Sequence, residues 1–379
     1  MQVASLPRKV IRGLPYLRKE IRSIVSDHTP FFIAKPRVVH IWRGAPCNAR
    51  CIMCDYGFLK GDAYRKLISS AFTDDLMPKT LEQIAELTGR GTVVSYMGGE
   101  PTVSKDLVEW VELASKLGLD FRFTTNGYKM DEELARKLTA AGLFNIGVSL
   151  ESLDPEINEV MRPHPQGTAK TIRAIELLMK ARDRQRARLS INVKTVLSDL
   201  NLESFIEIAK RYGKEDRMMV TPQMFEPMDG MPPETKEKLY VKDMARLQRI
   251  VEQIRELKAQ GYAIHVTEQG LREFIKLYSD DKARTSTMHN KDLEMDPSEP
   301  ECNIGTDNLW IHDGAVKLCP YHPPIGSVVT GTQTIKEMWD SELARQVRTG
   351  TRACRRLCTI SCLRRTPLTH KVVTFLRIA

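Results

Sequence analysis

The chain has 379 residues, of which 42% are hydrophobic and 28% are charged, fractions that are ordinary for a globular protein. It contains no apolar run of roughly eighteen residues, which excludes a membrane-spanning helix, and its N-terminus lacks the apolar region and cleavage site of a secretory signal. We therefore expect a cytoplasmic protein with one large α/β domain, or a large domain and a small one.

The net charge is +9, from 57 Lys and Arg against 48 Asp and Glu. This excess fits phosphate-bearing or other anionic partners, and no nucleic-acid partner is evident. Basic residues crowd residues 1–36 and the last residues of the chain, interleaved with apolar ones. The favoured interpretation is a helix packed on the domain with a charged, solvated face. The alternative is contact with an anionic membrane surface, which would make the protein peripheral to a membrane.

From residue 37 onward the pattern alternates strand and helix. Short apolar or β-branched runs predict buried parallel strands at 37–42, 92–97, 121–126, 145–150, 189–197 and 217–225. Amphipathic stretches between them predict helices at 80–89, 105–118, 131–142, 168–185 and 202–213, several of which end at glycine. Six such units in a row predict a parallel sheet, either open or curled toward a barrel.

After residue 228 the pattern changes. A Pro/Gly turn and one long helix are expected at 228–261, followed by a strand at 262–267 and a helix at 271–279. Residues 280–301 are polar and predict a long loop. Residues 308–320 predict a β-hairpin that turns at Asp313 and Gly314.

The eight cysteines form two groups separated by most of the chain. One group is Cys47, Cys51 and Cys54, directly after the first predicted strand, and the other is Cys302, Cys319, Cys354, Cys358 and Cys362. In a cytosolic protein this clustering favours metal ligation over disulfides. Three thiolates spaced C-x3-C-x2-C can hold three irons of a [4Fe–4S] cubane and leave the fourth iron open. The alternative is a zinc site that takes a fourth ligand from His40 or from the second group.

With the sequence GGEP at Gly98, Gly99, Glu100 and Pro101, after the second predicted strand, this cysteine motif resembles the radical S-adenosylmethionine (SAM) enzymes. The resemblance implies a partial (β/α)6 barrel of the TIM type, with the cysteines on the loop after the first strand and GGEP meeting the SAM amino group. It also implies that Asn126 lies near the site, that Ser149 contacts SAM and that Arg162 pairs with the SAM carboxylate. For Arg162 the alternative is a surface ion pair. Asn192 and Lys194 are further candidates or ordinary sheet-end residues, and Met53 stands where relatives often have an aromatic residue.

The resemblance also implies the chemistry. One electron from the reduced cluster cleaves SAM to methionine and a 5′-deoxyadenosyl radical, which removes hydrogen from a substrate. An electron donor such as flavodoxin or ferredoxin is expected. No catalytic acid or base is predicted.

Cys302 and Cys319 frame the pattern C-x11-G-x4-C, and Cys354, Cys358 and Cys362 follow as C-x3-C-x3-C. The first pattern resembles the opening of the SPASM and twitch extensions of radical SAM enzymes, which hold auxiliary iron–sulfur clusters. It implies a second [4Fe–4S] cluster with Cys302 and Cys319 as ligands, joined by members of the last three cysteines. Zinc is the alternative. The expected parts are a basic segment at 1–36, the barrel core at 37–228, a helical connection and polar loop at 229–300, and a small C-terminal iron–sulfur domain at 301–379.

The substrate expected from this resemblance is a small molecule or glycoconjugate, namely a sugar, glycoconjugate or lipid intermediate that is oxidised or rearranged. This expectation arises because the segment before Cys47 is short for a leader-peptide recognition domain. The alternative enzyme is a SPASM-type maturase of ribosomal peptides. An alternative of another class is a non-catalytic iron–sulfur or zinc protein, which GGEP disfavours.

Overall fold

The computed structural model describes residues 33–280, 305 and 307–352. Most of the basic N-terminal segment, most of the predicted polar loop and the last residues of the chain lie outside this part. Of the second cysteine group, Cys302, Cys354, Cys358 and Cys362 also lie outside it, so that only Cys319 can be placed.

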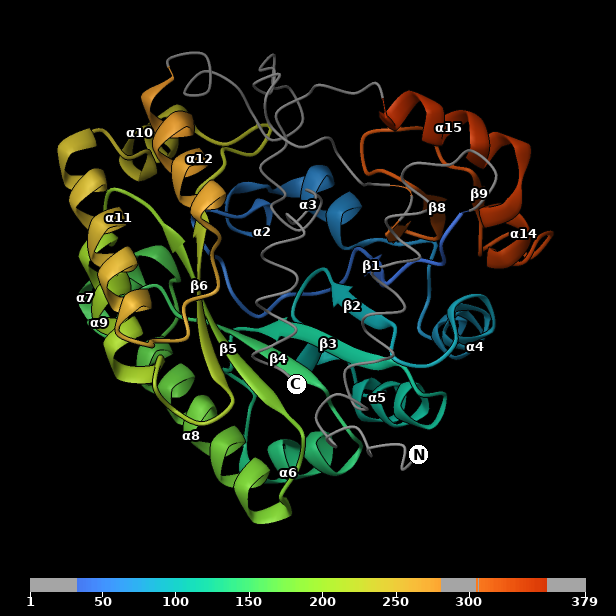
Figure 1. The fold of residues 1–379 in the computed structure, drawn as a ribbon, viewed down its shortest axis with the longest axis horizontal. Coiled ribbons are helices and arrows are strands. Elements are labelled where there is room, and N and C mark those ends of the chain that lie inside the picture. The colour runs from blue at the N-terminus through green and yellow to red at the C-terminus, as the bar shows by residue number, and fades with distance from the viewer. Residues whose placement is uncertain (1–32, 281–304, 306, 353–379) are drawn as a thin grey trace, which may run out of the picture.

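A curved sheet forms the centre of the structure (Figure 1), and its strands follow the order β6-β5-β4-β3-β2-β1-β7-β8-β9. All six predicted parallel strands are present: β1 (Val38–Trp42), β2 (Val93–Met97), β3 (Asp120–Thr125), β4 (Asn145–Ser149), β5 (Ser190–Leu197) and β6 (Met218–Met224). Neighbours along this series pair in parallel. Their carboxyl ends therefore lie along one edge of the sheet, which is where parallel α/β folds place their chemistry.

Helices cover the outer face of the sheet (Figure 1), which confirms the predicted α/β partial barrel. They are α4 (Leu76–Thr88), α5 (Leu107–Lys116), α6 (Glu132–Ala140), α7 (Pro155–Met161), α8 (Gly167–Gln185) and α9 (Leu202–Tyr212). Along each strand, successive side chains point to opposite faces of the sheet. Those that point outward pack in the core under the helices, as do Val39 and Ile41 of β1 and Phe121 and Phe123 of β3. His40 lies between Val39 and Ile41 and so faces the inside of the curved sheet.

The prediction of one long helix after residue 228 is wrong, because two helices form there. They are α10 (Pro233–Leu239) and α11 (Met244–Ala259). Tyr240 and Val241 between them are buried, and the Tyr240 hydroxyl donates to the Leu277 carbonyl at 2.9 Å. Asp243 then caps α11 by accepting a bond from the Arg246 backbone amide at 2.8 Å. Burial of the connection and a new N-cap thus override the helical periodicity.

The strand predicted at 262–267 is also wrong. Only Ile264 forms a bridge, to Val220 of β6. The amide of Ile264 bonds to the Tyr262 carbonyl and that of Val266 to the Ile264 carbonyl, so this backbone turns on itself and cannot extend a ladder. Thr267 then caps α12 (Glu268–Ser279), the predicted helix.

The predicted hairpin is confirmed, and it belongs to the barrel sheet. Strand β7 (Asn308–His312) pairs in parallel with β1 and antiparallel with β8 (Ala315–Lys317), which also pairs with β9 (Gly326–Ser327). Asp313 and Gly314 turn the hairpin with φ of 48° and 86°, as a two-residue hairpin turn requires. The helices α14 (Ile335–Asp340) and α15 (Glu342–Arg352) follow, and α14 packs on α4 (Figure 1). The described part of residues 301–379 therefore continues the barrel sheet, and the division into four parts remains a prediction.

Among the described helices, none has both the length and the apolar character needed to cross a membrane.

Candidate active site

The first cysteine group lies on the loop that follows β1, at the carboxyl edge of the sheet. Cys51 is buried, and Cys47 and Cys54 are partly buried. The loop coils tightly, since the Cys54 amide bonds to the Cys51 carbonyl at 3.1 Å and the Gly57 amide to the Cys54 carbonyl at 2.8 Å. A side chain at Gly57 would overlap the Cys51 carbonyl oxygen, so glycine is required for this coil. The short helices α2 (Asp55–Phe58) and α3 (Gly61–Ile68) continue the chain.

The GGEP turn, at the end of β2, lies directly against the cysteine loop. A Cβ atom at Gly98 would overlap the Arg43 carbonyl oxygen, and one at Gly99 would lie 2.5 Å from the carbonyl oxygens of both Ala45 and Pro46. Both glycines have positive φ, 104° and 52°. The Glu100 amide donates to the Pro46 carbonyl at 3.0 Å. The two sequence motifs therefore form one continuous backbone surface, and only glycine permits this approach.

Tyr56 links the same two segments, although sequence analysis did not identify it. Its buried hydroxyl accepts a hydrogen bond from the Gly99 amide at 2.9 Å and a longer one from the Ala45 amide at 3.5 Å. Burial raises the pKa of Tyr56 to about 12. The only feature of the sequence that could have pointed to Tyr56 is its position two residues after Cys54.

Glu100 is fully buried, and its carboxylate is held by four donors. Oε1 accepts bonds from the hydroxyls of Thr102 and Thr125 at 2.7 and 2.6 Å and from the Thr102 amide at 3.1 Å. Oε2 accepts a bond from the Asn126 amide at 2.8 Å. Burial raises the pKa of Glu100, and these four donors oppose the shift. In this structure the carboxylate joins the GGEP turn to the end of β3. Pro101, the last residue of GGEP, begins a short 3₁₀ turn after β2.

Asn126 lies beside the cysteine loop, next to the carboxyl end of β3. Its amide nitrogen Nδ2 donates to Oδ1 of Asn48 at 2.7 Å, and Asn48 lies between Cys47 and Cys51 in the sequence. The Asn126 side-chain oxygen accepts a bond from the Tyr128 amide at 2.9 Å. The structure thus brings Asn126 together with the cysteines. Its predicted contact with SAM remains a prediction.

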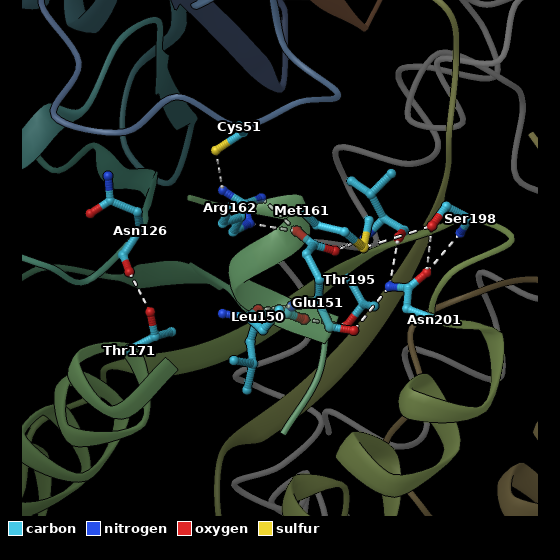
Figure 2. Close-up of polar contacts among 12 residues, drawn as sticks. Cys51, Asn126, Leu150, Glu151, Met161, Arg162, Thr171, Thr195, Ser198 and Asn201 are labelled. Atoms are coloured by element: carbon cyan, nitrogen blue, oxygen red, sulfur yellow. Dashed lines mark hydrogen bonds and ion pairs between the residues drawn. The ribbon is translucent and has the colours of Figure 1, made fainter. Parts of the chain in front are cut away.

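Arg162, at the end of α7, reaches the cysteine loop from another direction (Figure 2). Its Nη1 donates to the Cys51 sulfur at 3.3 Å, while its Nε bonds to Oε1 of Glu151 at 2.7 Å. The predicted alternative for Arg162 was a surface ion pair, but this ion pair is buried: the Glu151 side chain is 0% exposed and that of Arg162 is 14% exposed. Sequence analysis did not identify Glu151. The only feature that could have pointed to it is that a carboxylate stands two residues after the end of β4.

Of the other candidates, Ser149 is buried as the last residue of β4. On β5, the Lys194 ammonium donates to the Thr124 hydroxyl at 2.9 Å, and Oδ1 of Asn192 accepts from the Thr221 hydroxyl at 2.8 Å. Cys319 is buried in a small cluster with Trp310, against which Met97 at the end of β2 also packs.

The electrostatics of the loop favour neutral thiols until a metal binds. Burial raises the pKa of Cys47 to about 11 and that of Cys54 to about 12, and it raises the pKa of Cys51 as well. The neighbouring thiols add to the shifts of Cys47 and Cys54, which places the three groups within electrostatic range of one another. Ligation therefore has to displace three protons, as soft metal ions do readily from thiols.

The donor set fits an iron–sulfur cluster. Three thiols on one coiled loop are soft ligands, and in a cubane each would bind a different iron. Within the described ranges, no three Cys, His, Asp or Glu side chains converge on a single ion position.

Residues 44–212 match the family model of the radical SAM superfamily. The AdoMet-dependent heme synthase of Methanosarcina barkeri is 27% identical over 47% of this chain and 48% of its own. The mycofactocin maturase MftC of Mycobacterium ulcerans is 30% identical over 44% of this chain and 42% of its own. The chain thus spans about half the length of these curated relatives.

Among solved structures, Streptococcus suis SuiB bound to S-adenosylmethionine superposes with a TM-score of 0.60 at 15% identity, covering 92% of this chain and 75% of SuiB. This likeness shows a shared fold. The predicted cofactors, a [4Fe–4S] cluster and SAM, are those of the matched superfamily, and the curated relatives named above are enzymes. The cysteine loop, GGEP turn and partial barrel all lie within or beside the matched residues. Through this domain, residues 44–212, the chain is similar to the radical SAM superfamily.

Proposed function

We propose that the chain is an enzyme that cleaves SAM reductively at a [4Fe–4S] cluster held by Cys47, Cys51 and Cys54 and removes hydrogen from a substrate. The observation that carries this proposal is the direct contact between the cysteine loop and the GGEP turn, which leaves no room for a Cβ atom at Gly98 or Gly99. When bound, the cluster and SAM supply the electron and the 5′-deoxyadenosyl radical. The protein itself positions the cluster, SAM and the substrate relative to one another.

Different residues of this chain have different positioning roles. The three thiolates hold the cluster, and the backbone of Gly98 and Gly99 forms the adjoining wall. The buried carboxylate of Glu100 keeps the wall fixed to β3 through its bonds to Thr125 and Asn126. Asn126, Ser149 and Pro101 are proposed to line the SAM site from the ends of β3, β4 and β2. Cys319 is proposed to join Cys302 and members of the last three cysteines around a second cluster, with flavodoxin or ferredoxin as the electron donor.

For the substrate class, a peptide is better supported than the sugar, glycoconjugate or lipid intermediate favoured by the sequence alone. A maturase, MftC, is among the relatives, and structures that share this fold include SuiB bound to precursor peptide SuiA and anSMEcpe with the Cp18Cys peptide. The argument for a sugar depended on the length of the segment before Cys47, which does not bear on the barrel itself. We therefore propose modification of a peptide.

The test of the activity is anaerobic reconstitution followed by measurement of iron, sulfide and 5′-deoxyadenosine. The parent protein is expected to form 5′-deoxyadenosine from SAM with dithionite as reductant. The triple variant of Cys47, Cys51 and Cys54 to alanine is expected to lose about four irons per chain and all of that product. Equal product from parent and variant would refute the proposal.

The substrate class needs a separate measurement. Short synthetic peptides that correspond to open reading frames beside the gene would be compared with a panel of sugars and sugar nucleotides as stimulants of 5′-deoxyadenosine formation. Mass loss or cross-linking in a peptide would support the peptide proposal. Stimulation and turnover confined to the sugars would replace it with the class expected from sequence.

A further inference from the structure

The end of α7 makes two contacts with the cysteine loop. The Met161 carbonyl accepts a bond from the Ile52 amide at 3.0 Å, and the next residue, Arg162, donates from Nη1 to the sulfur of Cys51 at 3.3 Å. The backbone contact fixes where α7 ends relative to the loop. The side-chain contact places a permanent positive charge beside one of the three sulfurs.

Glu151 fixes the direction of that guanidinium. Its Oε1 accepts from both Nε and Nη2 of Arg162, at 2.7 and 2.6 Å, which leaves Nη1 directed at Cys51. Its Oε2 accepts from the Val196 amide at 2.6 Å, so the carboxylate cannot turn away. Figure 2 shows Glu151 between Arg162 and the segment of β5, with Cys51 on the far side of the guanidinium.

The backbone of Glu151 is anchored as well. Its amide donates to Oδ1 of Asn158 at 2.9 Å, and its carbonyl accepts from Nδ2 of Asn201 at 2.9 Å. Asn201 is in turn held by Ser198, whose hydroxyl lies 2.9 Å from Oδ1 of Asn201 (Figure 2). The ion pair is thus part of a rigid, buried network that includes the ends of β4 and β5 and the helix α7. A buried pair with all its polar atoms bonded is costly to break and specifies one geometry.

We propose, on the basis of the function proposed above, that Glu151 and Arg162 are positioning residues that set the reduction potential of the cluster at Cys47, Cys51 and Cys54. A hydrogen bond and a positive charge at a ligating sulfur stabilise the reduced cluster more than the oxidised one, because the reduced form carries one more negative charge. Arg162 therefore raises the potential. Glu151 has two opposing effects, since it holds the guanidinium in place and partly neutralises it.

The test is a redox titration followed by electron paramagnetic resonance, on anaerobically reconstituted protein without SAM. The signal is assigned as the one missing from the triple cysteine variant, so an auxiliary cluster cannot be mistaken for it. Arg162→Gln is expected to shift the midpoint potential to more negative values. Glu151→Gln keeps an acceptor for the guanidinium and removes the negative charge, so it is expected to shift the potential to more positive values. Arg162→Lys keeps the charge and is expected to lie nearer the parent than Arg162→Gln.

Arg50→Gln is the matched control. Arg50 belongs to the same loop, but it is exposed and donates to the carbonyls of Cys47 and Ala49 rather than to a sulfur. Its removal is expected to leave the potential near the parent value. A purely structural role for the pair would lower iron content without opposite shifts.

Shifts of the same sign in Arg162→Gln and Glu151→Gln, or equal shifts in Arg162→Gln and Arg50→Gln, would overturn the inference. If Arg162→Gln does not retain its iron, Glu151→Gln decides alone, and no shift or a negative one overturns the inference. Failure of the proposed function has a different signature, because no signal would then depend on the three cysteines.

Discussion

The phenolic oxygen of Tyr56 accepts a hydrogen bond from the Gly99 amide at 2.9 Å. This bond joins a residue just after the cysteine motif to the second glycine of the GGEP turn, across 43 positions in sequence. It is one of several ties between the two segments, with the Glu100 amide bond to the Pro46 carbonyl as another. The geometry of the proposed SAM site therefore depends on the fit of one loop against the other.

Tyr56→Phe tests this tie. The substitution removes the acceptor and leaves the Gly99 amide without this partner in a partly buried position, which costs up to about 1–3 kcal/mol. We expect weaker SAM binding with nearly unchanged iron content, measured by equilibrium dialysis and iron analysis. Tyr64→Phe, at a partly exposed tyrosine whose ring lies 6.4 Å from that of Tyr56, is the control and should leave both quantities unchanged. Parent-like SAM affinity in Tyr56→Phe would contradict the role given to this bond.

Gly99→Ala tests the close approach of the two loops. Its Cβ would lie 2.5 Å from two backbone oxygens, which cannot move without displacing the cysteine loop. We expect loss of 5′-deoxyadenosine formation by at least about tenfold, equivalent to roughly 1.4 kcal/mol.

Gly89→Ala is the matched control for that variant. Gly89 also has positive φ, 73°, but no atom lies within 4 Å of the added Cβ. Its ψ of −167° places it in a region that is almost restricted to glycine, so the variant should lose about 1–3 kcal/mol of stability through backbone strain and keep its activity. Equal losses of activity in the two variants would mean that strain, and not the contact with the loop, is responsible.

Glu100→Gln tests the buried carboxylate. The amide group of glutamine would face at least one of the four donors that now bond to Glu100, so a donor would lose its acceptor. We expect a decrease of about 2–3 kcal/mol in the free energy of unfolding, measured by urea denaturation under anaerobic conditions. Glu112→Gln removes an exposed carboxylate paired with Lys116 and should cost less than about 1 kcal/mol. A Glu100→Gln variant as stable as this control would refute the argument.

His40 predicts a pH dependence of stability. Burial, and then the charge of Arg122, lower the pKa of His40 from 6.5 to about 4, while its bond to Asn308 opposes the shift. Between these values the unfolded chain binds a proton that the folded chain does not. Stability is therefore complete above pH 6.5 and is lost as the pH falls toward 4, by up to roughly 3 kcal/mol. The measurement is urea denaturation at about pH 7 and about pH 5. His40→Gln should show a smaller difference between the two than the parent, and an equal difference would contradict the assignment.

The sequence alone determined the alternation of strands and helices and the place of the cysteine motif. Parallel strands buried on both faces have short apolar runs in their sequences, so both ends of each strand from β1 to β6 could be predicted to within one residue. The turn at Asp313 and Gly314 was equally readable, because few residues tolerate its positive φ values. Local signals failed between α10 and α11, where burial competed with periodicity, and at residues 262–267, where the backbone turns on itself.

Only the tertiary structure showed that Tyr56 and Glu151 also belong to the surroundings of the three cysteines. Tyr56 and Glu151 carry no motif, and a carboxylate two residues beyond a strand gives no sign that it will face Arg162 in a buried pair. These contacts join segments that are far apart in the chain, and they are fixed by the curvature of the sheet and by how closely loops can approach one another. Sequence patterns report the periodicity of single elements. The distances between atoms on different elements arise only when those elements pack.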